Sequence, residues 1–558
     1  MNPYVMMNQK KRATRNMNPH GSGEVLSRGF LLSLLAVMSA LSTADAQTVA
    51  AGNSVPKVVV NILIDQLRAD YINAYMPLYG EGGFKRLFRQ GRVYTRAEYP
   101  LEQTDLASAA ATLSAGTVPY DHGVVGRMWL DRNTLRPVFC VDDAKYLGTG
   151  GAMSGASPAS LMVSTLSDEL KISTEGKALV YSIAPFREAA IYMGGHAADG
   201  AVWIDPENGQ WSSSTYYGAL PQWAELRNLH HPIADAMKSG ETVSASASAA
   251  AAASVSPHMK KAAAKGTTFG VNHKFKGEHR FSTFLESGMV NGEIAAAVDD
   301  CLNGTEMGRD EITDYLAVTL YAGRFAEAGK SDPLLIQDTY VRLDDALARM
   351  IAAVEQRVGA DNALFVVSST GYEKMAAMDP AVYRIPSGFF DFQRATALLN
   401  MYLAAIYGQG MYVDATFGTQ IYLNHKLIED KQINFSELLK RSEDLLLRLS
   451  GVKNVFTSQR LQQGAWRPSL ERVKAGYHPS VSGDILIEVA PGWHYVNQFT
   501  DRKQLVRENY QPFPIIFYGQ AVQAEKVETP VTVDYIAPTL SKAMRIRAPN
   551  ACAHAPLF

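Results

Sequence analysis

Asp65 is the residue of this chain that stands out first for chemistry, because it directly follows the apolar run 55–64. The run is short and rich in β-branched residues, which is typical of a buried parallel strand. In open α/β sheets, chemistry gathers just beyond the carboxyl ends of the strands. Asp65 is therefore a candidate metal ligand or catalytic carboxylate. A helix N-cap is the alternative, since Asp also favours that position.

Strand-like and helix-like segments alternate along the chain. Further strands are expected at 314–320, 363–369 and 514–518. Between the first two, an amphipathic helix is indicated by apolar residues near helical spacing, namely Val341, Leu343, Leu347, Met350, Ile351 and Val354. The pair Asp344-Asp345 falls opposite this stripe and is expected to be solvated. The pattern predicts an α/β fold with a mostly parallel sheet sandwiched by helices.

The composition is that of a globular chain, with 558 residues, 47% hydrophobic residues and a net charge of −2. The near-neutral charge gives no indication of nucleic-acid binding. Residues 1–46 are predicted to be a signal peptide, because basic residues precede the apolar stretch 29–38 and Ala44-Asp45-Ala46 offers a cleavage site. No later run is long enough for a membrane span. The mature chain is expected to begin near Gln47 and to be periplasmic.

Two further features bear on organisation. Residues 244–256 are almost only Ala and Ser, so a mobile surface loop is expected at about 244–265. The three cysteines, Cys140, Cys301 and Cys552, allow one disulfide in an oxidising compartment and show no zinc-site spacing.

An ordered set of motifs resembles the phosphate-irrepressible periplasmic alkaline phosphatases. These belong to the alkaline phosphatase superfamily, alongside the nucleotide pyrophosphatases/phosphodiesterases. The resemblance spans nearly the whole mature chain. It rests on the segments 64–71, 79–87, 116–119 with His122-Gly123, 195–199, 203–205, 338–344, 482–485, 514–519 and 534–540.

The resemblance implies a two-zinc phosphatase site. In that family, three aspartates and three histidines bind the metals, and a Thr or Ser attacks phosphorus. Two dications lower the pKa of the nucleophile and stabilise the leaving oxygen. The resemblance also implies a cap-like insertion at about 127–300 and a second insertion at about 372–480.

The chain departs from this pattern at five of the six metal-ligand positions. Asp65 matches the first aspartate. Arg324 falls at the next aspartate and Ala328 at the histidine that follows it. The family's Asp-His-Gly falls on Thr370-Gly371-Tyr372, and the segment 503–514, where the last histidine belongs, contains none.

The nucleophile and phosphate-contacting positions depart as well. Counting back from Gly116 places Leu106 at the nucleophile, whereas counting forward from Tyr99 places Thr104 there. The family's phosphate-contacting Asn corresponds to Arg127. The family's Lys-x-Arg pair corresponds to Phe186 and Glu188.

The twelve histidines do not offer an obvious replacement site. His122 and His196 lie in family-like loops and are expected to be hydrogen-bonded loop histidines. His273 flanks the Ala/Ser segment, where a solvated loop is the expected setting.

Two hypotheses follow. In the first, the chain is an exported pseudophosphatase without zinc, which binds an unknown protein or a phosphorylated ligand in the periplasm. In the second, it is an active zinc-dependent phosphomonoesterase or phosphodiesterase with a rearranged site, Thr104 as nucleophile and Asp65 as a ligand. Under the first, an arginine is expected in the vestigial cleft near Asp65 and Thr370, with Arg324 before Arg127, because a guanidinium can replace the charge of a metal.

Overall fold

The computed structural model describes residues 55–238, 273–324, 333–372, 384, 386–464, 467–497, 502–506 and 512–558. The predicted signal peptide and the Ala/Ser loop at 244–265 lie outside the described residues. Within the described part, no helix is both long and apolar enough to cross a membrane.

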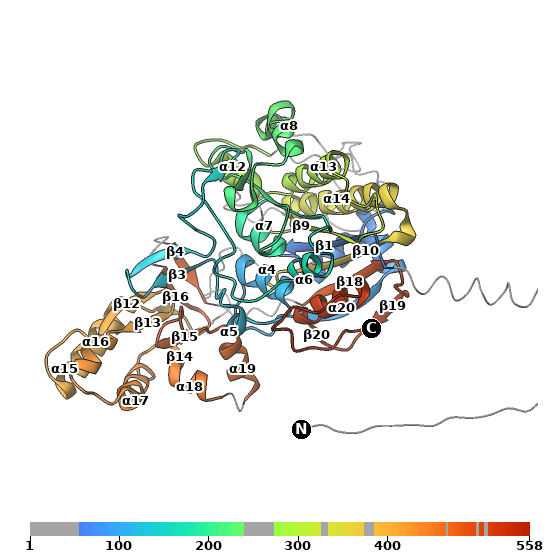
Figure 1. Cartoon of the computed structure of the whole chain (residues 1–558). Coiled ribbons are helices and arrows are strands. Elements are labelled where there is room, and N and C mark those ends of the chain that lie inside the picture. Colours follow the sequence, from blue (N-terminus) through green and yellow to red (C-terminus); the bar gives the residue numbers. More distant parts are fainter. Residues whose placement is uncertain are drawn as a thin grey trace, which may run out of the picture. The chain divides into compact units, whose positions relative to one another are not determined.

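A large mixed sheet lies at the centre of the structure (Figure 1). Strand β1 (Val58–Asp65) runs parallel to both of its neighbours, β9 (Asp314–Tyr321) and β10 (Ala363–Ser369). The strand order is β19-β2-β18-β10-β1-β9-β6-β7-β8-β5, with β20 paired to β2. The other strands are β2 (Arg92–Glu98), β5 (Gly148–Thr149), β6 (Val180–Ala184), β7 (Gly200–Ile204), β8 (Trp211–Ser214), β18 (Phe513–Gly519), β19 (Glu525–Val527) and β20 (Val531–Thr532).

The predicted α/β class is confirmed, and the sheet is mostly parallel. Strand β18 was expected from its apolar run, but it pairs antiparallel with β10 and β2. Strands β5 and β8 are also antiparallel to their neighbours.

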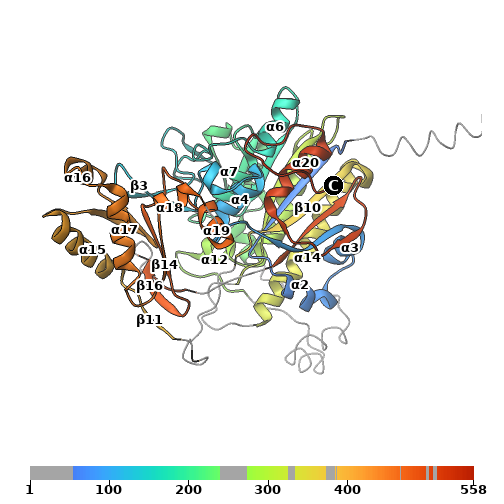
Figure 2. The ribbon, with the colours of Figure 1, turned by 90° about the horizontal axis from the view of Figure 1, so that it is seen from below.

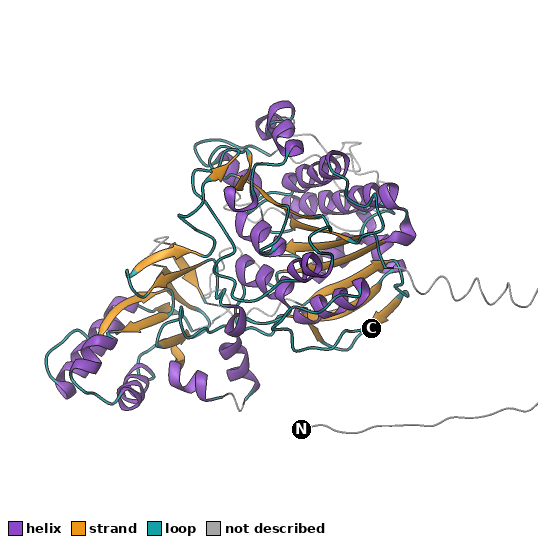
Figure 3. Ribbon diagram, viewed as in Figure 1, coloured by secondary structure: helices purple, strands orange, loops and turns teal. Residues whose placement is uncertain are grey.

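Helices cover both faces of the sheet (Figure 3). Successive residues of a strand point to opposite faces, so Ile62 packs in one core and Leu63 in another. The first core includes α2 (Ala69–Tyr75), α3 (Phe84–Gln90), α13 (Met289–Gly304) and α14 (Pro333–Val358). The second includes α4 (Leu106–Ala115), α6 (Leu166–Ser173), α7 (Arg187–Gly194) and α20 (Ile536–Met544). Figure 2 shows β10 between α14 and α20.

The amphipathic helix predicted around 341–354 lies within α14, and its apolar residues Leu343, Leu347, Met350, Ile351 and Val354 are fully buried. The expectation for Asp344 was wrong, because this side chain is buried. Its carboxylate accepts hydrogen bonds from Gly80 N at 2.8 Å and Phe84 N at 2.7 Å. Asp344 therefore binds the amino end of α3 to α14.

The segment predicted as a cap-like insertion, 127–300, is only partly one. Its residues 180–214 form β6, β7 and β8 of the central sheet. The sequence pattern alone did not reveal this because the group joins the sheet through the pairing of β6 with β9, more than a hundred residues away. The elements of the range that lie outside the central sheet include the hairpin β3 (Met128–Asp131) and β4 (Arg136–Phe139), with α8 (Gln222–His230), α9 (Ile233–Lys238) and α12 (Arg280–Leu285).

A second group of elements lies between β10 and β18 in sequence and has its own core. Four strands form an antiparallel sheet in the order β12-β13-β15-β14, and β11, β16 and β17 form a smaller one. The strands are β11 (Gly388–Phe389), β12 (Val413–Phe417), β13 (Gln420–Leu423), β14 (Val452–Thr457), β15 (Ile485–Val489), β16 (Trp493–Asn497) and β17 (Arg502–Leu505). The helices are α15 (Phe392–Tyr407), α16 (His425–Asp430), α17 (Phe435–Leu446), α18 (Ser458–Gln463) and α19 (Pro468–Ala475).

Candidate functional site

Asp65 lies at the carboxyl end of β1, as the sequence predicted, and its side chain is only 2% exposed. Its Oδ1 accepts a hydrogen bond from Thr370 Oγ1 at 3.0 Å. Its Oδ2 accepts one from Gln66 Nε2 at 3.1 Å. Because β1 and β10 are adjacent parallel strands, their ends bring Asp65 and Thr370 together at one edge of the sheet.

The backbone turns sharply after Asp65. Gln66 has a φ of 63°, an uncommon conformation for a residue with a side chain. Its backbone N–H donates to Thr370 Oγ1 at 2.9 Å. The Thr370 hydroxyl therefore accepts from Gln66 and donates to Asp65, which fixes the turn and the carboxylate together.

Tyr372 also contacts this carboxylate. Burial raises the pKa of the Tyr372 phenol well above its usual value, and the charges of Asp65 and Asp105 and a hydrogen bond with Asp65 raise it further. The phenol is thus protonated and acts as a donor to Asp65. In the family pattern this position is the glycine of the Asp-His-Gly motif, so a bulky neutral side chain stands where the resemblance implies none.

Arg127 and Glu188 form an ion pair in the same region. Arg127 Nε lies 2.7 Å from Glu188 Oε1, and the Glu188 side chain is 1% exposed whereas that of Arg127 is 46% exposed. The geometry is that of a charge contact, since neither oxygen of Glu188 accepts a hydrogen bond from a described residue. The charge of Glu188 raises the pKa of Arg127. Arg127 was expected beside Asp65, but the structure pairs it with Glu188.

Asp105 occupies the N-cap of α4. Its Oδ1 accepts from Ser108 N at 2.9 Å, and its Oδ2 accepts from Arg127 N at 2.5 Å. Burial raises the pKa of Asp105, against the effect of these hydrogen bonds. Thr104, the candidate nucleophile, directly precedes this cap, and Leu106, the other candidate, is the first residue of α4 and is buried. A leucine cannot act as a nucleophile, so Thr104 is the candidate that carries a hydroxyl.

Arg324 follows the end of β9 and donates from Nη2 to Tyr71 Oη at 3.2 Å. Strand β9 is the neighbour of β1, and the backbone of Asp65 pairs with Tyr321, three residues before Arg324. A pairing of Arg324 with the Asp65 carboxylate stays a prediction.

The residues at this edge do not fit a two-zinc centre. Zinc in proteins prefers thiolate, imidazole and carboxylate ligands. Of the six ligand positions that the resemblance implies, Asp65 is the one that keeps such a ligand. The hydroxyl of Thr370 lies next to it. Among all described residues, no three His, Cys, Asp or Glu side chains are arranged to hold a metal ion. The three cysteines are free thiols, two of them buried, so the possible disulfide is not formed.

The histidine predictions have mixed outcomes. His122 is buried, its Nε2 lies 3.1 Å from Thr112 Oγ1, and burial lowers its pKa to about 3, so it is a neutral structural residue. His273 was expected in a solvated loop, but it is buried and its Nε2 lies 2.7 Å from Asp338 Oδ2.

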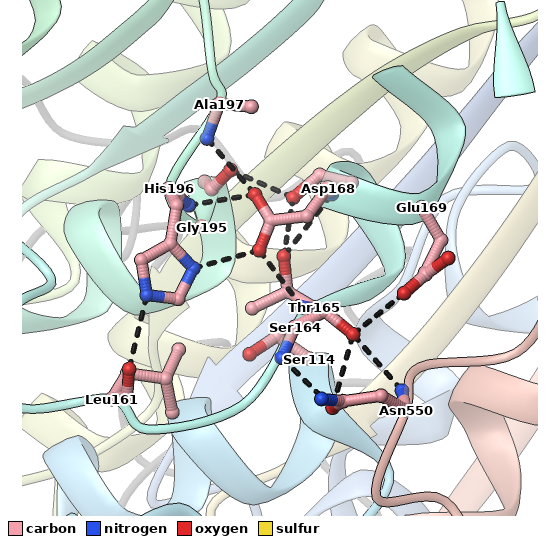
Figure 4. A network of polar contacts seen from close by, with 12 residues as sticks. Ser114, Leu161, Ser164, Thr165, Asp168, Glu169, Gly195, His196, Ala197 and Asn550 are labelled. Carbon is pink, nitrogen blue, oxygen red and sulfur yellow. Dashed lines mark hydrogen bonds and ion pairs between the residues drawn. The ribbon is translucent and has the colours of Figure 1, made fainter. Parts of the chain in front are cut away.

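His196, just after α7, contacts the first turn of α6 and the segment at Leu161, as Figure 4 shows. Its Nδ1 lies 2.8 Å from Asp168 Oδ2, and its Nε2 lies 3.0 Å from the carbonyl oxygen of Leu161. Both partners only accept hydrogen bonds, so both contacts are satisfied together by the protonated imidazolium. Burial lowers the pKa of His196, but the hydrogen bond and charge of Asp168 outweigh this and raise it overall. The prediction of a hydrogen-bonded loop histidine is confirmed.

The sheet order and the carboxylate at the end of the central strand define an α/β protein with a mostly parallel sheet covered by helices. The chain matches the type I phosphodiesterase / nucleotide pyrophosphatase family over residues 59–512, and it belongs to that family and to the alkaline phosphatase superfamily.

Curated relatives cover most of the chain. Alkaline phosphatase PafA of Elizabethkingia meningoseptica is 26% identical over 521 residues, which cover 90% of this chain and 94% of that protein. A Myroides odoratus protein named calcium-transporting ATPase is 28% identical over 518 residues, which cover 89% and 93%. The crystal structure of wild-type PafA matches with a TM-score of 0.74 at 24% identity, covering 90% of this chain and 99% of that one, which supports the fold.

Three residues of this region were not singled out from the sequence. Tyr372 stands at the family's glycine position and Asp105 follows Thr104, but no local pattern indicates that Tyr372 hydrogen-bonds to Asp65 or that the charge of Asp105 raises the Tyr372 pKa. The signal for Asp105 was its place just before α4 together with Ser108 three residues later, a capping-box spacing. Gln66 offered no signal, since its role depends on a backbone conformation.

Proposed function

We propose that this chain is a pseudophosphatase, an alkaline phosphatase superfamily protein that does not hydrolyse phosphate esters through a zinc centre. It acts instead as a binding or scaffolding protein in the periplasm. The observation that carries the proposal is the ion pair between Arg127 and Glu188. Both residues occupy positions that the family resemblance assigns to phosphate contact.

The charge of Glu188 opposes phosphate binding. The arginine that the family has at this position would attract a phosphate dianion, whereas the buried carboxylate of Glu188 repels it. Arg127 brings a cation nearby, but its charge is already opposed by Glu188. Compared with the Asn and the Lys-x-Arg pair of the family, Arg127, Phe186 and Glu188 therefore carry less net positive charge at the phosphate position.

The contacts of Asp65 support the same interpretation. Thr370, Gln66 and Tyr372 hydrogen-bond to its carboxylate. A buried carboxylate needs partners when no cation neutralises it. Here hydroxyl, amide and phenol groups supply them, so the carboxylate is accommodated without a metal.

Hydrolysis assays test this proposal. We expect the purified mature chain to show no zinc-dependent release from aryl phosphate monoesters or diesters above a buffer control. PafA of Elizabethkingia meningoseptica, assayed in parallel, controls for the assay. Turnover that requires zinc and disappears in Thr104→Ala would establish the rearranged active site instead. The matched control is Thr134→Ala, which changes an exposed hydroxyl outside the cleft.

A further inference from the structure

Two adjoining pockets lie on the second group of elements, away from the edge of the sheet that carries Asp65. One has a volume of about 640 Å3 and the other of about 620 Å3. Ser436 of α17 and Gln459 of α18 line both of them, so the two pockets are neighbours. Pockets of some hundreds of Å3 are typical of sites for small organic ligands.

The pocket between α17 and α18 is basic. Lys440 lies one helical turn after Ser436 on α17, so both face the same groove. Arg460 lines it from α18, and Arg467, the N-cap residue of α19, lines it from a third side. The one acid in the lining is Glu443, which accepts from Arg460 Nη1 at 2.9 Å. Three cations thus meet one carboxylate, which leaves a net positive charge.

The adjoining pocket is nearly balanced in charge. Arg132 and Lys426 line it together with Asp414 and Asp484. Asp484 is buried and accepts from Arg132 Nη1 at 3.2 Å and from His425 Nε2 at 2.9 Å. The remaining lining is rich in neutral hydrogen-bonding groups and contains aromatic rings, from Asn424, Gln459, Gln462, Ser436, Ser458, Tyr477 and Phe435. Such a surface suits hydroxyl groups on a neutral body.

We infer that the two adjoining pockets together bind an organic ester of a tetrahedral oxyanion, phosphate or sulfate, on a hydroxyl-rich body. The oxyanion lies among Lys440, Arg460 and Arg467, and the body lies in the balanced pocket. A guanidinium presents parallel donors that match phosphate and sulfate oxygens, and a lysine adds a point charge. This site shares no residue with the cleft at Asp65, so the inference holds whether or not the cleft hydrolyses phosphate.

Calorimetric titration of the purified mature chain tests the site. The probes are glucose 6-phosphate, glucose 6-sulfate, glucose and inorganic phosphate. We expect at least one ester to bind more tightly than both glucose and inorganic phosphate. Lys440→Glu and Arg467→Glu should each weaken that binding by about tenfold or more. Tighter binding of one ester identifies the oxyanion as phosphate or sulfate.

Two control variants distinguish binding at this site from a general charge effect and from binding in the cleft. Arg441→Glu makes the same charge change next to Lys440, but Arg441 binds Glu437 and does not line the pocket, so it should leave affinity unchanged. Arg127→Ala changes the cleft and should also leave affinity unchanged. Absence of ester binding up to about 1 mM would overturn the inference. So would equal losses in Lys440→Glu and Arg441→Glu, or binding abolished by Arg127→Ala under conditions in which that variant stays folded.

Discussion

Arg127 Nε and Glu188 Oε1 lie 2.7 Å apart, and this contact joins the start of β3 to the start of α7. The partners are unequal, because the carboxylate is buried and the guanidinium is half-exposed. The main effect of the pair is therefore to neutralise the buried charge of Glu188.

Removing the guanidinium should destabilise the fold. We expect Arg127→Ala to lower the free energy of unfolding by about 1–3 kcal/mol, less than for a fully buried pair because solvent screens the exposed arginine. Glu188→Gln in the same chain should recover part of this loss, since no buried charge is then left unpaired. Denaturant unfolding of the two single variants and the double variant measures the coupling. Additive losses would show that the two charges do not interact. Arg136→Ala, an exposed arginine on the neighbouring strand β4, is the control.

The Thr370 hydroxyl should stabilise the turn after β1. Thr370→Val keeps the shape but leaves Gln66 N and Asp65 Oδ1 each without one hydrogen bond, so we expect a loss of about 1–3 kcal/mol. Thr319→Val on β9 is the matched control, because Thr319 is equally buried and its hydroxyl has no hydrogen-bond partner among the described residues. That change should be near neutral. Equal losses in the two variants would contradict the role given to Thr370.

Asp344 should act as a cap for α3. Asp344→Ala removes the acceptor of the Gly80 and Phe84 amides, and we expect a loss of about 0.5–2 kcal/mol. Asp345→Ala changes the adjacent, exposed carboxylate and should have little effect. Thermal unfolding of both variants near neutral pH provides the measurement. A larger effect at Asp345 than at Asp344 would be inconsistent with the contacts of α14.

Stability should depend on pH through His196. Its pKa in the folded chain is raised above 6.5. The stabilisation that protonated His196 contributes is therefore fully present below about pH 6.5, the pKa of histidine in the unfolded chain. It is lost as the pH rises through the pKa in the folded chain. His196→Gln should reduce the difference in melting temperature between pH 6 and pH 8. The same difference in both proteins would show that the imidazolium does not hold the contacts seen in Figure 4.

The sequence was sufficient for the centre of the fold, because β1, β9 and β10 are short, buried and rich in β-branched residues. Their bounds agree with the expected runs within a few residues. The direction of β18 could not be predicted, since an apolar run is the same for parallel and antiparallel pairing. The burial of Asp344 was missed because helical periodicity describes one helix, whereas α3 approaches that helix from a distant part of the chain.

The sequence predicted where the candidate site lies, but it did not predict most of the contacts between the residues of the site. The end of β1 located Asp65, and the family pattern located Thr370, Arg127 and Glu188. The pattern assigns each position to a role separately, so it gave no sign that Arg127 pairs with Glu188. The contact of Tyr372 with Asp65 arises where a glycine is expected, and only the folded chain shows it.

The zinc content of the purified mature chain distinguishes a pseudophosphatase from a zinc-dependent phosphatase. The chain should be prepared with zinc present, freed of loosely bound metal on a desalting column, and analysed by elemental analysis, with PafA of Elizabethkingia meningoseptica treated in the same way. We expect no stoichiometric zinc, because Asp65 is the one family ligand retained and its carboxylate is held by Thr370, Gln66 and Tyr372. About two zinc ions per chain, the content of a two-metal site, would contradict it.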